Sequence, residues 1–545
     1  FKQKTAYEIS LGLVGSEMCI RDRLEDEVIC RCGTKVVVAI LEDQWFITYS
    51  DREWKNASLE TLADMHIVPE FYRTQYENVF EWLEDKPCTR SKGLGTKFPW
   101  DETKVIEPLG DSTIYMAYFT ISHLIKKIDP EKLNDEIFDY IFLNKGNLEE
   151  LSKKYGIEKE MLEEMRKNFD YWYPLAYNVS AIELIPNHMS FSIFHHTAIF
   201  PKEKRQKGTL NLGMLIIEGQ KMASSKGNVK LVTDMVDAIG ADMLRLFLMN
   251  VVEPWQEMDW RQREVEKGLK IVNNLLEFVY ENAKKFQKED NKKETPHLEK
   301  WLLNQFNFRL KNASQHMESF ELRKAIQQLI FQFANDIKWF EKRGGILTKE
   351  TFMQIFKKWT ICISPFMPHI AEELWKEGFN ENGFVIQQKW PSYAEIDEKL
   401  MQEEEYIKKL VEDLREVQQL AKIKHPKRII LYIAPKWKWD ALQRIQNATK
   451  EKKDFGKAMK AVMELEQAKE KPAEAKALVS FIMKHLADFL NKEFLDEFEI
   501  LKREKEFLER EFCCEVAIEN AEAPGFDPAK KAPKAIPLKP AVYME

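Results

Sequence analysis

The sequence predicts an α/β domain, followed by an α-helical bundle and then by a small α+β domain. Three observations support this order. Strand-like and helical patterns alternate over residues 46–263, helical periodicity runs almost unbroken over 264–377, and one strand-like run, RIILYIAP (428–435), stands among charged helical stretches after Pro391. A chain of 545 residues is also too long for a single hydrophobic core, which agrees with several domains.

Composition and charge limit the kind of protein this can be. The chain is 44% hydrophobic and carries a formal charge of −7, which excludes a globally basic nucleic-acid binder but leaves room for local basic patches. Seven cysteines over this length argue against a disulfide scaffold and predict a reducing, cytoplasmic setting. No apolar run reaches the roughly 18 residues that a membrane-spanning helix needs, so we expect no membrane association.

The first 23 residues stand apart from the rest. FKQKTAYEISLGLVGSEMCIRDR has a basic start but lacks the continuous apolar core of a signal peptide. It resembles a translated sequencing-adaptor read-through, so we expect residues 1–23 to be non-native and exclude them from the fold prediction. After them, alternating β-branched and aromatic residues predict strands over 28–49.

Helices and loops then alternate. Apolar residues at three- and four-residue spacing predict helices over 51–81 and 112–128, and the Gly- and Pro-rich run 88–100 between them is too irregular for a helix or a strand. The apolar run FSIFHHTAIF (191–200) is expected to be buried. No internal repeat is evident.

A second helical stretch, residues 147–170, carries its own boundary signals. Asn147 is a good N-cap, and Gly156 should divide the stretch into two helices. Further on, a strand is expected over 211–217, and the helical pattern resumes from Val232.

The loop after that strand has an unusual composition. In IIEGQKMASSKGN (216–228), Lys221 and Lys226 bracket a serine-rich turn. A short, flexible, cationic loop after a strand suits a polyanion that is held briefly and then released. The alternative is a solvated surface turn, which is what most Lys/Ser/Gly runs are.

The neighbouring sequence decides between these two interpretations. EGQKMASSKGN (218–228) resembles the KMSKS signature of class I aminoacyl-tRNA synthetases, and GADMLRLFLM (240–249) and EMDWRQREVEKG (257–268) resemble the sequence downstream of that signature in the leucyl, isoleucyl, valyl and methionyl subclass. Four further stretches resemble archaeal-type leucyl-tRNA synthetases: PCTRSKGLGTKFPWD (87–101), IEPLGDSTIYMAYFTI (106–121), FDYWYPL…ELIPNHMSFSIFHHTAIF (169–200) and the final AIPLKPAVYME (535–545).

The resemblance implies a reaction and a set of sites. The reaction is ATP-dependent formation of leucyl-adenylate, with Mg²⁺ accompanying ATP as substrate, and transfer of leucine to tRNA-Leu. Cationic and hydroxyl groups suit this chemistry because phosphoryl transfer depends on positioning and on neutralising developing negative charge. The implied catalytic residues are Lys221, Lys226, Ser224 and Ser225. The implied ATP and adenylate site adds Met222, Gly227, Asn228, Glu183 and His188, and the implied amino-acid pocket contains Asp111, Ser112, Thr113 and Tyr115.

Two of these segments depart from the family pattern. Ala223 and Ser224 stand where KMSKS has serine and lysine, so the usual second lysine is absent; Lys226 could substitute for it because a lysine side chain is long and flexible. AYNVSAIEL (176–184) stands where the family has DLRVSGKDL. Ser112 as a helix N-cap and His188 as a lone buried histidine remain alternative interpretations.

Basic and aromatic residues are mixed in the tail, and two cysteines lie close together near the start. The implied tRNA-binding residues are Lys424, Lys427, Arg428, Lys436, Trp437, Lys438, Lys534 and Lys539, a mixture that suits phosphate contact and base stacking. The alternative for any single lysine is a solvated charged face. Cys30 and Cys32 resemble half of a Zn²⁺ ribbon, although a two-cysteine turn on its own is more often structural or unoccupied.

The resemblance also suggests domain boundaries. We expect returning strands of an editing insertion at 24–45, the second half of a class I Rossmann-type catalytic domain at 46–263, an anticodon-binding-type bundle at 264–395 and a tRNA-recognition domain at 396–545. None of the ten histidines lies in an HxGH element, and most of the editing domain is absent, so we expect the chain alone to be inactive and monomeric. A non-catalytic tRNA-binding protein and an isoleucyl, valyl or methionyl enzyme are the alternatives.

Overall fold

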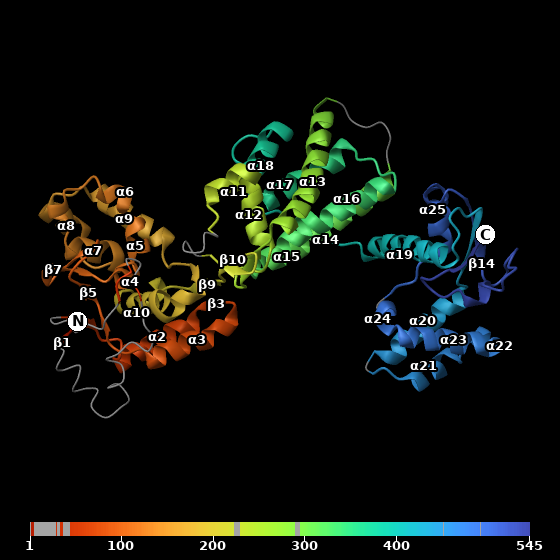
Figure 1. The fold of residues 1–545 in the computed structure, drawn as a ribbon, viewed down its shortest axis with the longest axis horizontal. Coiled ribbons are helices and arrows are strands. Elements are labelled where there is room, and N and C mark those ends of the chain that lie inside the picture. The colour runs from red at the N-terminus through yellow and green to blue at the C-terminus, as the bar shows by residue number, and fades with distance from the viewer. Residues whose placement is uncertain are drawn as a thin grey trace. The chain divides into compact units, whose positions relative to one another are not determined.

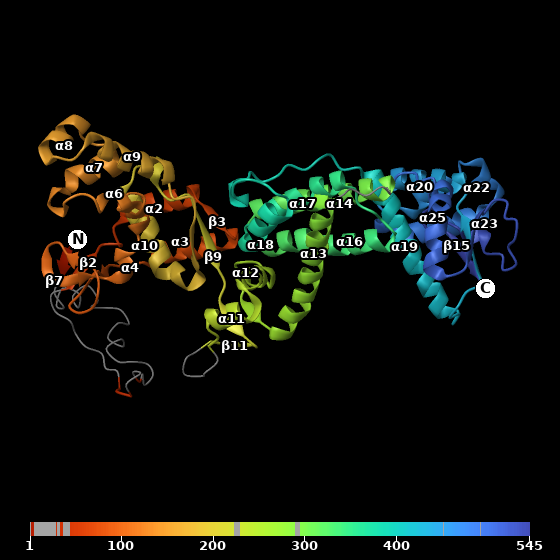
Figure 2. The same ribbon diagram turned by 90° about the horizontal axis from the view of Figure 1, so that it is seen from above.

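The computed structural model describes residues 2–4, 29, 33–35, 44–222, 229–288, 295–450, 452–490 and 492–545. Its contacts divide the chain into two compact units (Figures 1 and 2). Unit 1 comprises the described residues within Phe1–Met235, Phe247–Gln262 and Phe320–Arg323. Unit 2 comprises those within Val236–Leu246, Arg263–Ser319 and Lys324–Glu545.

A parallel sheet with helices packed against it forms the centre of unit 1. Its strand order is β3 (His66–Val68), β9 (Gly208–Leu212) and β8 (Asn178–Ala181). Helices α2 (Arg52–Asp64), α3 (Arg73–Trp82) and α10 (Ser190–Ile199) pack together with β3 around a common hydrophobic core. Parallel strands require crossover connections, which here contain helices, so the predicted α/β class is confirmed.

The expected single helix over 51–81 was wrong, because β3 interrupts it. Ile67 and Val68 are β-branched, and Pro69 follows them. A proline disfavours the helical conformation in the residue before it and cannot donate a backbone hydrogen bond, so Val68 is extended and α3 begins only after the turn at Glu70–Tyr72.

Two antiparallel sheets flank this core. One has the order β5 (Thr89–Arg90), β7 (Asp101–Ile106) and β6 (Lys97–Phe98), so the run 88–100, expected to be irregular, contains short strands. In the other, β2 (Gln44–Ile47) pairs with β4 (Lys86–Pro87) and with the backbone of β1 (Lys2–Lys4). Of the strands expected over 28–49, the described residues contain β2 and an isolated bridge between Ile29 and Lys35.

A group of helices with its own core lies between β7 and β8. These are α4 (Pro108–Asp111), α5 (Tyr115–Phe119), α6 (Ser122–Ile125), α7 (Asp135–Leu143), α8 (Leu148–Tyr155) and α9 (Lys159–Trp172). The predicted boundary signals of 147–170 are confirmed: the Asn147 side chain accepts from the backbone N–H groups of Glu149 and Glu150, and Gly156 ends α8 with φ 60°. The helix expected over 112–128 is divided between α5 and α6.

Replacing Asn147 by alanine is expected to lower the free energy of unfolding by about 1 kcal/mol, because the first turn of α8 would lose its side-chain acceptor. Asn147→Ser is the matched control, since serine is an equally good N-cap and should remain close to wild type. Chemical denaturation measures both variants. Equal losses in the serine and alanine variants would show that the cap is not the cause.

The strand expected over 211–217 is two strands. β9 ends at Leu212 and β10 (Leu215–Ile217) begins after Gly213, where an added Cβ would lie 2.0 Å from the carbonyl oxygen of Gln256. Strand β10 pairs antiparallel with β11 (Gln220–Lys221) and parallel with β12 (Met258–Trp260). Helices α11 (Val232–Ile239) and α12 (Ala241–Asn250) follow, as the sequence predicts from Val232.

Most of the predicted helical bundle belongs to unit 2. It contains α13 (Gln262–Lys288), α14 (Pro296–Glu318), α15 (Leu322–Ile326), a π-helical stretch at Gln327–Gln332, α16 (Phe333–Lys342), α17 (Lys349–Ile363) and α18 (Pro368–Glu373). Large aromatic side chains fill its interior, among them the fully buried Trp301, Phe306 and Trp359. The predicted bundle is confirmed.

The tail of unit 2 combines helices with one small sheet. Its strands run in the order β14 (Glu515–Asn520), β13 (Arg428–Ile433) and β15 (Ala541–Met544), with β13 parallel to β14 and antiparallel to β15. Its helices are α19 (Glu398–Leu420), α20 (Lys436–Thr449), α21 (Phe455–Val462), α22 (Glu466–Glu470), α23 (Pro472–Lys484), α24 (Leu486–Phe489) and α25 (Glu497–Phe512). The α+β composition therefore matches the sequence prediction, while the proposed boundary at residue 396 stays a prediction.

Candidate active site

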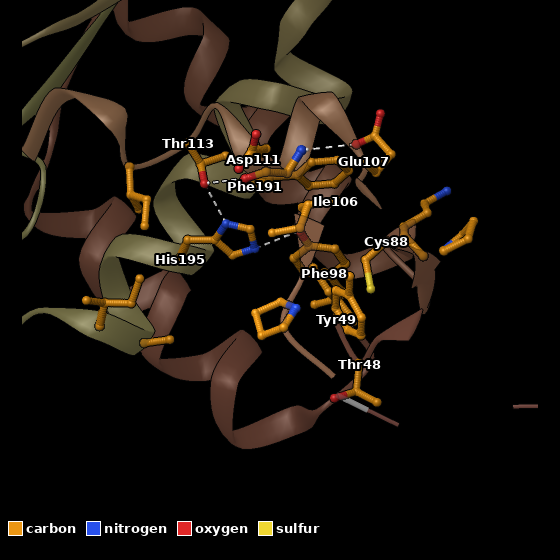
Figure 3. Close-up of a pocket in the computed structure, with 18 of the residues that line it drawn as sticks. Thr48, Tyr49, Cys88, Phe98, Ile106, Glu107, Asp111, Thr113, Phe191 and His195 are labelled. Carbon is orange, nitrogen blue, oxygen red and sulfur yellow. Dashed lines mark hydrogen bonds between the residues drawn. The ribbon is translucent and has the colours of Figure 1, made fainter. Parts of the chain in front are cut away.

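A cavity of about 430 Å³ lies in unit 1 beside α10 (Figure 3). Most of its lining is aromatic or aliphatic, and polar groups gather near the 107–113 segment. The residues that line it include Ile47, Thr48, Tyr49, Trp54, Cys88, Phe98, Ile106, Glu107, Asp111, Thr113, Phe191 and His195. The thiol of Cys88 also lines this cavity, but burial raises its pKa to about 11, so it is protonated at neutral pH and is a poor nucleophile.

His195 lies at the polar end of this cavity. Its Nε2 is 2.9 Å from the hydroxyl of Tyr49, and its Nδ1 is 2.6 Å from Oγ1 of Thr113 (Figure 3). Removal from water lowers the pKa of His195 to about 4, and the neighbouring His196 and His188 act in the same direction. The imidazole is therefore neutral at physiological pH.

The predicted amino-acid pocket residues lie on the turn between α4 and α5. Thr113 is fully buried, Oδ2 of Asp111 accepts from the Thr96 hydroxyl at 3.0 Å, and Tyr115 is exposed. Ser112 ends α4, and Ile114 is the N-cap of α5, so the interpretation of Ser112 as a helix N-cap was wrong. The turn separates the first cavity from a second, of about 600 Å³, which Ser112 and Tyr115 line.

His188 and Glu183 lie just beyond the carboxyl end of β8, on short turns at Ile185–Met189 and Ile182–Leu184. Nδ1 of His188 is 3.1 Å from the hydroxyl of Ser112, so two of the predicted site residues are in contact. The side chain of Glu183 is exposed. Ligands of open α/β sheets bind outside the carboxyl ends of the strands, which is where these residues lie.

The signature loop is described in part. Lys221 lies on β11, and Met222, which is half-buried, follows it. Ser224, Ser225, Lys226, Gly227 and Asn228 lie outside the described residues, as do Cys30 and Cys32.

The two sequence motifs around this loop meet in space. Glu218 (φ 48°) and Gly219 (φ 75°) form the turn between β10 and β11, and the N–H of Gly219 donates to Oδ1 of Asp259 at 2.9 Å. The bond from Gly219 and the Arg261 side chain lower the pKa of Asp259. Because Asp259 lies on β12, the EGQK and MDWR stretches form one local structure.

The basic residues of the tail differ in their exposure. Lys424, Lys427, Lys436, Lys534 and Lys539 are exposed, and Arg428 is half-buried. In contrast, Trp437 and Lys438 are 4% and 2% exposed; Lys438 Nζ donates to the carbonyls of Pro533 and Ala535 and pairs with Glu474 at 3.2 Å. The expectation that these two side chains contact RNA was wrong, because both are packed inside the tail.

Metal-binding clusters and membrane-spanning helices are both missing from the described residues. These residues contain no group of three or more His, Cys, Asp or Glu side chains arranged to hold a metal ion. Within the same residues, no helix is long and apolar enough to cross a membrane.

The sequence prediction missed Tyr49 and His195 as parts of the site. Tyr49 follows β2, 146 residues before His195, and nothing in its local sequence indicates a partner. A signal existed for His195: two adjacent histidines interrupt the otherwise apolar run FSIFHHTAIF, and buried polar groups require hydrogen-bond partners.

The chain resembles known proteins over nearly its whole length. Residues 34–261 match the class I tRNA synthetases (I, L, M and V), and residues 299–433 match the anticodon-binding domain of tRNA ligases. A leucine–tRNA ligase of Pyrococcus abyssi is 40% identical over 536 residues, or 96% of this chain and 54% of that protein. A leucine–tRNA ligase of Methanocaldococcus jannaschii is 39% identical over 527 residues, with coverages of 96% and 54%.

Among solved structures, the LeuRS in a LeuRS–tRNA–LeuAMS ternary complex from Agrobacterium radiobacter K84 matches with 16% identity and a TM-score of 0.39. That match covers 58% of this chain and 40% of the other, and it is too weak to support any conclusion.

The two matching domains place the chain among the class I aminoacyl-tRNA synthetases. Within that class, leucine–tRNA ligases of archaea match it over 96% of its length. The chain spans about half the length of these relatives.

Proposed function

We propose that the chain is part of a leucine–tRNA ligase, which forms leucyl-adenylate from leucine and ATP and transfers leucine to tRNA-Leu. The observation that carries the proposal is the 40% identity to leucine–tRNA ligases across 96% of the chain. The motifs GLGT and DSTIYMAY and the terminal AIPLKPAVYME support leucine over the other amino acids of the subclass.

The residues have distinct roles in this proposal. Ser112 and Tyr115 would contribute polar groups to the leucine pocket. His188, whose ring is 3.1 Å from the Ser112 hydroxyl, would belong to the adjoining adenylate site just beyond the carboxyl end of β8. Asp111 and Glu183 are placed to attract the leucine ammonium and the ribose hydroxyls. Lys221 and Lys226 would neutralise the charge that develops as the carboxylate attacks the α-phosphate of ATP and pyrophosphate leaves.

The partners of the chain are part of the same proposal. ATP would bind with Mg²⁺, and tRNA-Leu would contact the exposed tail residues Lys424, Lys427, Lys436, Lys534 and Lys539. We further propose a cytoplasmic monomer. A Zn²⁺ site at Cys30 and Cys32 stays a prediction from the sequence.

One assay separates the proposal from its alternatives. The chain, supplied with an HxGH-containing segment from a leucine–tRNA ligase, is tested for ATP–pyrophosphate exchange with leucine, isoleucine, valine or methionine, and for filter binding of the matching tRNA transcripts. Exchange with leucine alone supports a leucine–tRNA ligase, whereas exchange with one of the other three amino acids identifies a sibling enzyme. Binding of tRNA-Leu without any exchange would favour the non-catalytic tRNA-binding protein.

Lys226→Ala is expected to reduce leucine-dependent exchange about 100-fold, because one cationic group would no longer stabilise the developing phosphate charge. Ser224→Lys should leave the rate unchanged if Lys226 already replaces the missing lysine. Lys230→Ala is the matched control just outside the signature. A large gain in the Ser224→Lys variant would show that Lys226 does not substitute.

A further inference from the structure

The hydrogen bonds that join His195 of α10 to residues 110–113 have a defined donor and acceptor at each contact. A carbonyl oxygen only accepts, so the Thr113 hydroxyl donates its single proton to the Gly110 carbonyl at 2.8 Å. The Thr113 oxygen must therefore accept at its other contact, which is Nδ1 of His195 at 2.6 Å. His195 consequently carries its proton on Nδ1.

The other ring nitrogen of His195, Nε2, completes this chain of hydrogen bonds. In a neutral imidazole with Nδ1–H, Nε2 is an acceptor, so the Tyr49 hydroxyl donates to it at 2.9 Å. In the reverse tautomer the ring proton would be on Nε2, and the Tyr49 hydroxyl would have no acceptor among the described residues. Thr113 would then have to donate to Nδ1 of His195 instead of to the Gly110 carbonyl. Burial raises the pKa of Tyr49 well above its usual range, so this donor keeps its proton.

Packing fixes the ring as well as its protons. The His195 ring stacks on Tyr49 with centroids 5.8 Å apart, and Tyr49 stacks on Phe191 at 4.8 Å. Thr113 is fully buried, so its side chain cannot exchange this partner for water. Tyr115, at the other end of the 111–115 segment, is exposed, so burial does not hold it in the same way.

We propose that His195, held as its Nδ1–H tautomer by Tyr49, is a positioning residue that anchors Thr113 and thereby fixes the 111–115 segment for its ligand. His195 acts from the far side of that segment, because it lines the first cavity whereas Ser112 and Tyr115 line the second. The identity of the ligand as leucine or leucyl-adenylate rests on the proposed function; the anchoring itself does not.

Two substitutions of His195 test its two ring nitrogens separately. Asparagine places an N–H donor near the position of Nδ1, whereas glutamine places its amide near the position of Nε2. His195→Asn should therefore keep the bond to Thr113, and His195→Gln should lose it. We expect His195→Gln to weaken binding of a non-hydrolysable leucyl-adenylate analogue about tenfold by calorimetry, the scale of one lost hydrogen bond, and His195→Asn to stay near wild type.

Two further measurements on the full chain do not depend on the ligand. Hydrogen exchange of a peptide covering 108–119 should rise in His195→Gln but not in His195→Asn. Histidine ¹⁵N NMR of the wild type, with the His195 signal assigned by its loss in the variants, should show a neutral Nδ1–H ring, and Tyr49→Phe should shift it toward Nε2–H.

The outcomes distinguish the two proposals. Failure of the wild type to bind the analogue would count against the proposed function, while the exchange and NMR results would still decide the anchoring. Equal exchange in the asparagine and glutamine variants, or an Nε2–H ring in the wild type, would overturn the role of His195.

Discussion

Replacing Arg343 by methionine is expected to lower the free energy of unfolding by about 3–5 kcal/mol. Arg343 follows α16, its side chain is 1% exposed, and its guanidinium pairs with Glu404 of α19 and Glu504 of α25. Glu404 also accepts from Nε1 of Trp339 at 2.5 Å. Without the cation, Glu404 would remain as a carboxylate that is almost excluded from water, and Glu504 would keep only its pair with Arg503 at 2.9 Å. Chemical denaturation followed by tryptophan fluorescence measures the loss.

Two control variants separate burial from charge. Arg444→Met removes an arginine whose pair with Glu464 is solvent-exposed, and it should cost less than about 1 kcal/mol. The triple variant Arg343→Met/Glu404→Gln/Glu504→Gln removes all three charges and should recover much of the loss, because no unpaired charge remains buried. A single variant as stable as Arg444→Met would contradict the expectation, and so would a triple variant that is no better than the single one.

The features that the sequence predicts well are those decided by local chemistry. Asn147 and Gly156 mark helix ends because a side-chain acceptor and a left-handed residue satisfy nearby backbone groups. The bundle is predictable because its apolar periodicity is long. Strand β3 was missed because it is only three residues long and lies between two helical patterns, and its pairing with β9 connects positions 142 residues apart.

The same distinction between local and long-range contacts applies to the residues of the site. Ser112 and His188 were predicted from motifs, and the structure places them in contact. Tyr49 and His195 depend on contacts across long stretches of chain, which no local pattern reports. Lys438 shows the opposite failure: its local sequence is typical of a nucleic-acid-binding surface, but α20 turns this side chain toward the carbonyls of Pro533 and Ala535.

Replacing Glu497 by glutamine is expected to change how stability depends on pH. Glu497 begins α25, and its carboxyl accepts from Nε1 of Trp439 at 3.0 Å and from the N–H of Leu538 at 3.1 Å. Burial raises the pKa of Glu497 from 4.5 to about 8. The folded protein therefore holds a proton that the unfolded chain releases above about pH 4.5, so the stability contributed by this group is present below pH 4.5 and is lost as the pH rises toward 8.

The difference between the wild-type and Glu497→Gln unfolding free energies isolates this proton, because other titrating groups contribute equally to both proteins. The difference should fall by up to about 1.4 kcal/mol per pH unit between pH 4.5 and 8, on the order of 5 kcal/mol in total, and be constant outside that range. Glu499→Gln, which removes an exposed carboxylate on the same helix, is the matched control. A flat curve for Glu497→Gln would mean that this carboxyl ionises in the folded state as it does in water.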